Sequence, residues 1–202
     1  MLEDPSAREE KTVMWRVVLY LTPVTVTTSL LLTLLGALGL RSAATRWPRT
    51  VCRIGSLALV LWLVLIAAAT FTSDGSTGGS VGGLWLSPGL ETLTADDAYV
   101  TADEKEMVVR QWVANALMFV PLPVLLAAAR PGSSAARRLG ACAAAAVVVE
   151  LVQWIEDNGR VVDLDDVLFT AIGASLGVGL DVTARLILKL FQGRRAEAGE
   201  RV

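Results

Sequence analysis

Polar side chains that could bind a ligand or move a proton gather between residues 150 and 166. Glu150 and Gln153 lie three residues apart, and Asp163 and Asp166 repeat that spacing. Arg160 lies between the two pairs, just after an Asn-Gly turn. A buried carboxyl group with a raised pKa can act as a general acid or base, and a guanidinium binds anions through a planar fork. These residue types predict a ligand site or an acid–base site, and the elements around them must position it.

The surrounding chain is strongly apolar. Of its 202 residues, 53% are hydrophobic and only 19% are charged, and the mean hydropathy is +0.55. These values lie outside ordinary soluble usage, so we expect an all-α integral membrane protein that contacts lipid and has no nucleic-acid partner. The sequence contains no histidine, which excludes Ser-His-Asp and Cys-His catalysis. Cys52 and Cys142 begin apolar runs, and we interpret both as packing residues.

Five apolar segments approach the roughly 20 residues that cross the hydrocarbon core as a helix. We therefore expect a bundle of about five transmembrane helices, at residues 17–40, 54–71, 112–129, 139–155 and 167–190. The first is not interpreted as a cleavable signal, because a basic loop follows it. The expected organisation is an N-terminal segment with its basic loop (1–53), a Gly/Ser-rich and acidic loop (72–111), a core (108–190) and a tail (191–202).

Arginines in the short loops predict the orientation. The loops at 41–53 and 130–138 carry several arginines and no acid, whereas the loop at 72–111 is mostly acidic. Because basic residues are retained on the cytoplasmic side, the first two loops and the C-terminal tail are expected inside and the acidic loop outside. The residues before the first span then start outside, despite three basic residues there. The polar cluster is predicted at the extracytoplasmic side of the bundle.

Glu150 is the one carboxyl group of this cluster that is expected inside an apolar span. At 1.5 Å per residue, Glu150 lies roughly 10 Å deeper than Asp157, which follows seven residues later. An ionised carboxylate at that depth is costly, so Glu150 should be protonated, paired with an arginine, or facing a water-filled cavity. Arg160 is the natural partner for Glu150 or Asp163.

The third span adds an amide from a second helix. Asn115 should lie about one turn below the outer surface, and Phe119 shares its face. Pro121 and Pro123 cannot donate backbone hydrogen bonds, which predicts a kink just below Asn115.

The last span begins with three aspartates. Acids at helix amino-termini cap free amides, and for Asp165 we favour this interpretation. Asp163, Asp165 and Asp166 are also weak candidates as oxygen ligands for magnesium or calcium. Asp166 heads a face of small residues that includes Gly173 and Gly177, on which another helix could pack closely.

Near the other end of the same helix, Asp181 and Arg185 stand four residues apart. This spacing predicts a local ion pair close to the inner surface.

Three blocks occur in order with helix-sized gaps: NALMFVPL, ELVQ and GRVVDLDDVLFTAIGASLG. Over residues 108–182 they resemble the VanZ-like family of small bacterial membrane proteins. Two positions depart from the usual family pattern, namely Pro123 where glycine is usual and Thr170 where asparagine is usual. The resemblance implies a bacterial plasma-membrane protein of the cell envelope, and the founding members are associated with resistance to teicoplanin-type glycopeptides.

Three functions remain open. The favoured one is an outer-leaflet pocket that binds an amphiphile, either a lipid-linked envelope precursor or a glycopeptide; its residues would be Asn115, Glu150, Gln153, Arg160, Asp163 and Asp166. The second is an enzyme in which Glu150 acts as acid or base beside Asp163 and Asp166. The third is a purely structural bundle. No cofactor is expected, and the oligomeric state stays open.

Overall fold

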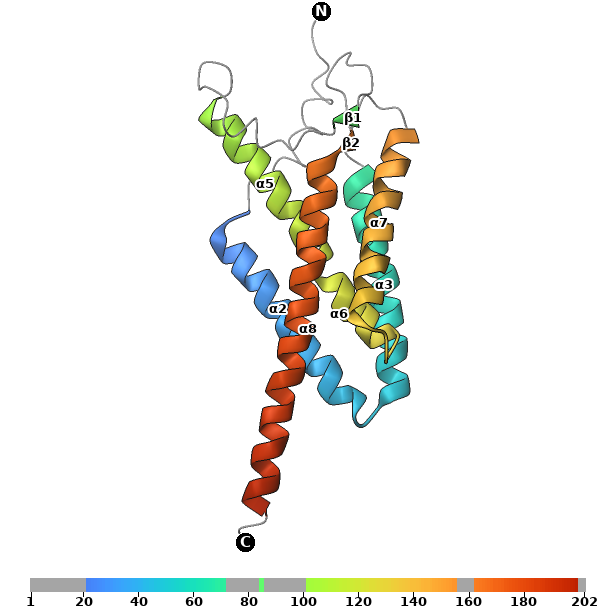
Figure 1. Cartoon of the computed structure of the whole chain (residues 1–202), viewed down its shortest axis with the longest axis vertical. Helices are drawn as coiled ribbons and strands as arrows, with labels where there is room; N and C mark the ends of the chain where they lie inside the picture. The colour runs from blue at the N-terminus through green and yellow to red at the C-terminus, as the bar shows by residue number, and fades with distance from the viewer. Residues whose placement is uncertain (1–20, 72–83, 86–100, 156–161, 200–202) are drawn as a thin grey trace, which may run out of the picture.

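The computed structural model describes residues 21–71, 84–85, 101–155 and 162–199, and within these ranges it is a helical bundle (Figure 1). The helices are α2 (Pro23–Ala44), α3 (Pro48–Phe71), α5 (Ala102–Phe119), α6 (Pro121–Ala129), α7 (Ala135–Ile155) and α8 (Leu164–Gly199). This confirms the expected all-α membrane fold. Arg160 and most of the loop at 72–100 lie outside the described residues, as do residues 1–20.

Within the described ranges, four helical stretches are long and apolar enough to cross a membrane. They are Pro23–Ala44, Pro48–Ala69, Lys105–Ala129 and Val167–Arg194. Helix α7 coincides with the remaining expected span, and its 21 residues give a length of about 30 Å. Large apolar side chains such as Leu32 and Leu57 are exposed on α2 and α3, where hydrocarbon tails would solvate them.

Helix α2 begins later than predicted, because Thr22 and Pro23 form its amino-terminal end. The Thr22 hydroxyl accepts a hydrogen bond from the Thr25 amide at 3.2 Å, and the Thr25 hydroxyl accepts one from the Thr22 amide at 2.8 Å. Proline is well suited to the first turn, where its missing amide hydrogen has no helical partner. The Thr27 hydroxyl donates to the carbonyl of Pro23 at 2.7 Å, a bond that hydroxyls in helices commonly form.

The predicted basic loop at 41–53 is much shorter in the structure. Helix α2 continues to Ala44 and α3 begins at Pro48, so residues 45–47 form the connection. Arg41 and Arg49 therefore belong to helices. The sequence pattern misplaced these boundaries because arginine is a good helix former although it is unfavourable in lipid.

The third span is bent where the prolines predicted a kink. Helix α5 runs without interruption from Ala102 to Phe119, and α6 continues from Pro121. Val120 between them keeps helical dihedrals (φ −58°, ψ −45°), so the chain changes direction without leaving the helical region. The Trp62 indole donates to the carbonyl of Met118 at 2.8 Å, which provides a partner for a carbonyl at this junction.

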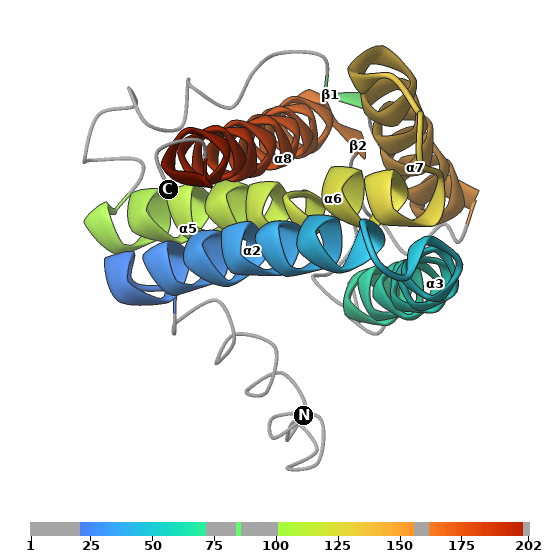
Figure 2. The same ribbon diagram turned by 90° about the horizontal axis from the view of Figure 1, so that it is seen from below.

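Helix α6 is the packing centre of the bundle. It contacts every other described helix, and in Figure 2 it lies between α8 and α3. Helix α8 runs the length of the molecule and packs against α2, α5, α6 and α7 (Figure 1). The main buried cluster joins five helices and consists of Ile66, Phe119, Leu122, Cys142, Ala146 and Ala174.

A short parallel pairing lies beside the start of α8. Strand β1 (Leu84–Trp85) pairs with β2 (Val162–Asp163), with Leu84 opposite Val162 and Trp85 opposite Asp163. These two-residue strands bring the loop between α3 and α5 to the amino-terminal end of α8, at the end of the bundle opposite the α2–α3 connection (Figure 1).

Candidate functional site

The described residues of the predicted polar cluster lie on four elements, α5, α7, β2 and α8. Helix α8 packs between α5, which carries Asn115, and α7, which carries Glu150 (Figure 1). Both side chains are half-buried. Asp165 lies in the first turn of α8 and is only 2% exposed.

The other predicted residues are placed by their backbone alone. Gln153 lies on α7, three residues after Glu150, Asp163 lies on β2, and Asp166 lies in the first turn of α8. Arg160 falls outside the described residues, so its expected pairing with Glu150 or Asp163 stays a prediction.

Two glycines on α8 allow α5 to approach closely. A Cβ atom added to Gly173 would lie 1.9 Å from the carbonyl oxygen of Ala116, and one added to Gly177 would lie 2.1 Å from that of Val120. Side chains cannot occupy such positions, so only glycine permits this contact. Because Ala116 follows Asn115, the same contact holds the Asn115 region of α5 against α8.

Aromatic packing and a small polar residue complete this interface. The rings of Trp112 and Phe169 stack with their centroids 4.8 Å apart and an angle of 13° between planes. Thr170 is buried, and its hydroxyl donates to the carbonyl of Val167 at 2.8 Å. This hydroxyl therefore bonds within its own helix.

An apolar groove begins one helical turn beyond Asp165. It has a volume of about 560 Å³ and lies between α2, which contributes Leu30, and the outer face of α8. The α8 side chains that line it include Leu168, Ile172, Leu176 and Leu180. The arrangement thus places a long apolar surface next to the acidic start of α8.

Metal ligation finds no support among the residues whose side chains the structure describes. In that part of the chain no three His, Cys, Asp or Glu side chains converge on one point. The side chains of the weak candidates Asp163 and Asp166 are not among those described.

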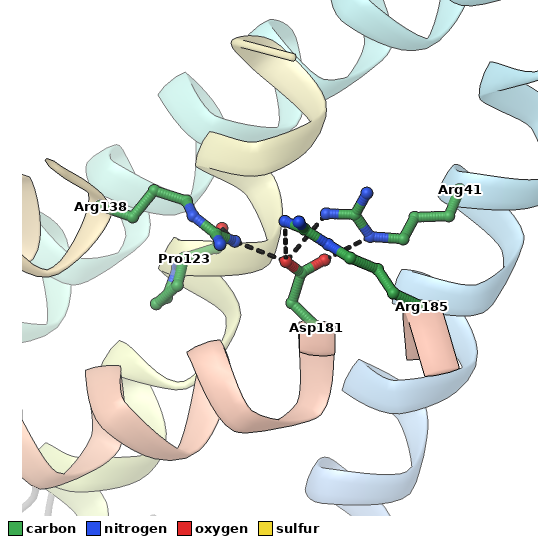
Figure 3. A network of polar contacts seen from close by, with 5 residues as sticks. All are labelled: Arg41, Pro123, Arg138, Asp181 and Arg185. Carbon is green, nitrogen blue, oxygen red and sulfur yellow. Dashed lines mark hydrogen bonds and ion pairs between the residues drawn. The ribbon is translucent and has the colours of Figure 1, made fainter. Parts of the chain in front are cut away.

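A second polar centre surrounds Asp181, near the middle of α8 (Figure 3). Its Oδ2 atom lies 2.6 Å from Nη1 of Arg138 and 2.8 Å from Nη2 of Arg185. Arg41 contacts both carboxylate oxygens, with Nε 2.6 Å from Oδ1 and Nη2 2.8 Å from Oδ2. Asp181 is 1% exposed and Arg138 is 2% exposed.

The local pair between Asp181 and Arg185 was predicted and is confirmed. The contributions of Arg41 and Arg138 were not predicted, because both residues were assigned to loops. One signal was available: Asp181 is an acid at the end of the bundle where the basic loops gather, and a buried carboxylate requires several donors. The cluster joins α2, α7 and α8, and its three guanidiniums exceed the one carboxylate by two positive charges.

These features define a class of protein: a multi-pass membrane bundle in which one long helix carries an acidic start and a buried aspartate near its middle. The family model described as VanZ/LLP1 matches residues 53–187, which is more than half of the chain, and the protein belongs to this family. The match includes Arg138 and Asp181 but begins after Arg41. Comparisons with curated proteins and with solved structures gave no match.

Proposed function

We propose that this VanZ-family protein binds an amphiphilic molecule of the bacterial cell envelope. The polar head would contact the cluster formed by Asn115, Glu150, Gln153, Arg160, Asp163 and Asp166, and the hydrocarbon chain would lie in the groove between α2 and α8. In this proposal the protein resides in the plasma membrane with its C-terminus in the cytoplasm and the polar cluster at the outer leaflet.

The observation that carries this proposal is the adjacency of the groove to the polar end. Asp165 is buried in the first turn of α8, and Leu168, three residues later, lines the groove. A ligand with a polar head and a long apolar tail fits a polar surface that is followed by an apolar groove, because each part of the ligand would lie against groups of its own polarity. Arg160 supplies a cation for a phosphate or carboxylate head.

Family membership supports a more specific role in resistance to teicoplanin-type antibiotics. Both candidate ligands, a lipid-linked precursor and a lipoglycopeptide, combine a polar head with a hydrocarbon chain. Binding either one would change how much antibiotic reaches its target at the membrane surface.

Photo-crosslinking tests the groove. A diazirine-bearing polyprenyl diphosphate is added to the full chain in lipid nanodiscs, and labelling is compared between wild type and Ile172→Trp, which fills the groove. Leu186→Trp is the matched control, because Leu186 is also exposed on α8 but does not line the groove. Labelling should fall at least several-fold for Ile172→Trp alone. Equal labelling of wild type and Ile172→Trp would refute the proposed groove.

Antibiotic susceptibility tests the physiological role. A strain lacking the protein is complemented with wild type or with Glu150→Ala and challenged with teicoplanin and vancomycin. The proposal expects wild type to restore growth in teicoplanin and Glu150→Ala to fail while accumulating normally in the membrane. Full complementation by Glu150→Ala would show that resistance does not depend on the polar cluster.

A further inference from the structure

A second pocket lies at the opposite end of the bundle, at the connection between α6 and α7. It has a volume of about 260 Å³ and is lined by Arg130, Pro131, Gly132, Ser133, Arg137 and Arg138, with Leu126 and Ala141 on its apolar side. We call it the arginine pocket. It does not share a lining residue with the groove between α2 and α8.

A tight turn shapes the wall of the arginine pocket. The Ser133 amide donates to the carbonyl of Arg130 at 3.1 Å, and Gly132 has a φ of +89°. Proline at the second position and glycine with positive φ at the third are the features of a type II turn, which has little conformational freedom. Ser134 then caps α7 by accepting the Arg137 amide at 3.2 Å. The turn at 130–133 and the capped start of α7 therefore give the pocket two walls of fixed backbone.

Two buried polar atoms of pocket-lining residues have no hydrogen-bond partner among the described residues. They are the Ser133 hydroxyl oxygen and Nε of Arg138. Both groups can donate, and a buried donor without an acceptor costs free energy. An anion in the pocket would supply acceptor oxygens to both.

The charge around the arginine pocket also favours an anion. Arg130 and Arg137 add two guanidiniums to Arg138, and no acid lines the pocket. Arg138 is shared with the Asp181 cluster, where arginines already exceed carboxylates. Nη1 of Arg138 donates a hydrogen bond to Asp181, which fixes the guanidinium in place and leaves Nε for a second partner.

We propose that the arginine pocket binds a phosphate group. Guanidiniums recognise tetrahedral phosphate oxygens by charge-assisted hydrogen bonds, and basic pockets between membrane helices are suited to anionic headgroups. The volume is several times the roughly 30 Å³ of one water molecule, so the phosphate can carry a substituent. The phosphate comes either from an anionic phospholipid or from a soluble phosphate compound. This site is independent of the ligand proposed for the polar cluster.

Lipid retention and phosphate titration distinguish the two sources. The full chain is purified, mixed with phosphatidylcholine micelles that contain a minor fraction of phosphatidylglycerol, and examined by native mass spectrometry for bound lipid. In a parallel arm without phosphatidylglycerol, inorganic phosphate and glycerol 3-phosphate are titrated and the melting temperature is followed. Lipid binding without a phosphate-dependent shift identifies a phospholipid headgroup, and the reverse identifies a soluble phosphate compound.

The variant Arg130→Gln/Arg137→Gln removes two charges from the arginine pocket. Arg46→Gln/Arg49→Gln is the matched control, because it removes two exposed arginines at the neighbouring α2–α3 connection, outside the pocket. Binding should weaken about tenfold or more in the pocket variant, as for loss of charge-assisted hydrogen bonds, and by less than about twofold in the control. Equal weakening in both variants, or no binding by wild type in either arm, overturns the proposal.

Ser133→Ala tests the hydroxyl without changing the charge. Binding should weaken on the order of threefold to tenfold, and Ser133→Thr should restore it, because threonine keeps the donor. Unchanged binding in Ser133→Ala would show that general attraction to arginine, and not the built pocket, holds the anion.

Discussion

Nη1 of Arg138 lies 2.6 Å from Oδ2 of Asp181, and both side chains are almost completely buried. This contact joins the beginning of α7 to the middle of α8, and Arg41 brings the end of α2 to the same carboxylate (Figure 3). Burying a carboxylate is costly unless several donors replace its water. The Asp181 cluster therefore makes the packing of three helices interdependent.

Asp181→Asn should destabilise the protein strongly. The substitution keeps the shape of the side chain but leaves Arg138 buried without a counter-charge, which costs about 3–5 kcal/mol in comparable buried pairs. The free energy of unfolding measured by denaturant titration in mixed micelles would report it. Arg185→Gln is the control: Arg185 is 42% exposed, so its loss should cost less than about 1 kcal/mol. Similar small losses in both variants would contradict the interdependence of the three helices.

Gly173→Ala should separate α5 from α8. The added methyl group would overlap the Ala116 carbonyl, and relief of such overlap typically costs about 1–3 kcal/mol. Gly179→Ala is the matched control on the same helix, since nothing lies within 4 Å of its added Cβ; it should be neutral or stabilising by about 0.5–1 kcal/mol. The melting temperatures of both variants check the prediction, and a Gly173→Ala variant as stable as wild type would refute the close approach.

Trp62→Phe should weaken the junction between α5 and α6. Phenylalanine keeps the aromatic packing but cannot donate to the Met118 carbonyl, and an unsatisfied buried carbonyl costs about 1–3 kcal/mol. Trp47 is 62% exposed, so Trp47→Phe should change stability by no more than about 0.5 kcal/mol. Thermal unfolding of the two variants provides the comparison, and equal effects would mean that the indole hydrogen bond contributes nothing.

Cysteine accessibility tests the predicted orientation. In a background carrying Cys52→Ser and Cys142→Ala, the substitution Ala102→Cys should react with a membrane-impermeant maleimide in intact cells. Ser134→Cys should react only after the membrane is permeabilised, because basic loops are retained inside. Serine at position 52 preserves the donor that Cys52 directs to the Ala129 carbonyl. The opposite labelling pattern would invert the topology and place the Asp181 end outside.

Several features could be predicted from local sequence because their causes are local. Hydrophobic runs indicate spans wherever their length matches the bilayer, and the bend at Val120 follows from two prolines that lack a backbone donor. The pair between Asp181 and Arg185 follows from helical periodicity. Span ends were less well predicted. Helices α2 and α3 take up most of the predicted basic loop at 41–53, because helices continue into polar sequence when their ends can be solvated.

The sequence by itself determined the class of protein, the approximate spans and the polar residues near the start of the last helix. Only the tertiary structure decided which helices are neighbours, because the period of a helix specifies its faces but not the partner of each face. Arg41 lies 140 residues from Asp181 and Arg138 lies 43 residues from it. No spacing rule reaches across such separations, and the helix packing alone brings these arginines to one buried carboxylate.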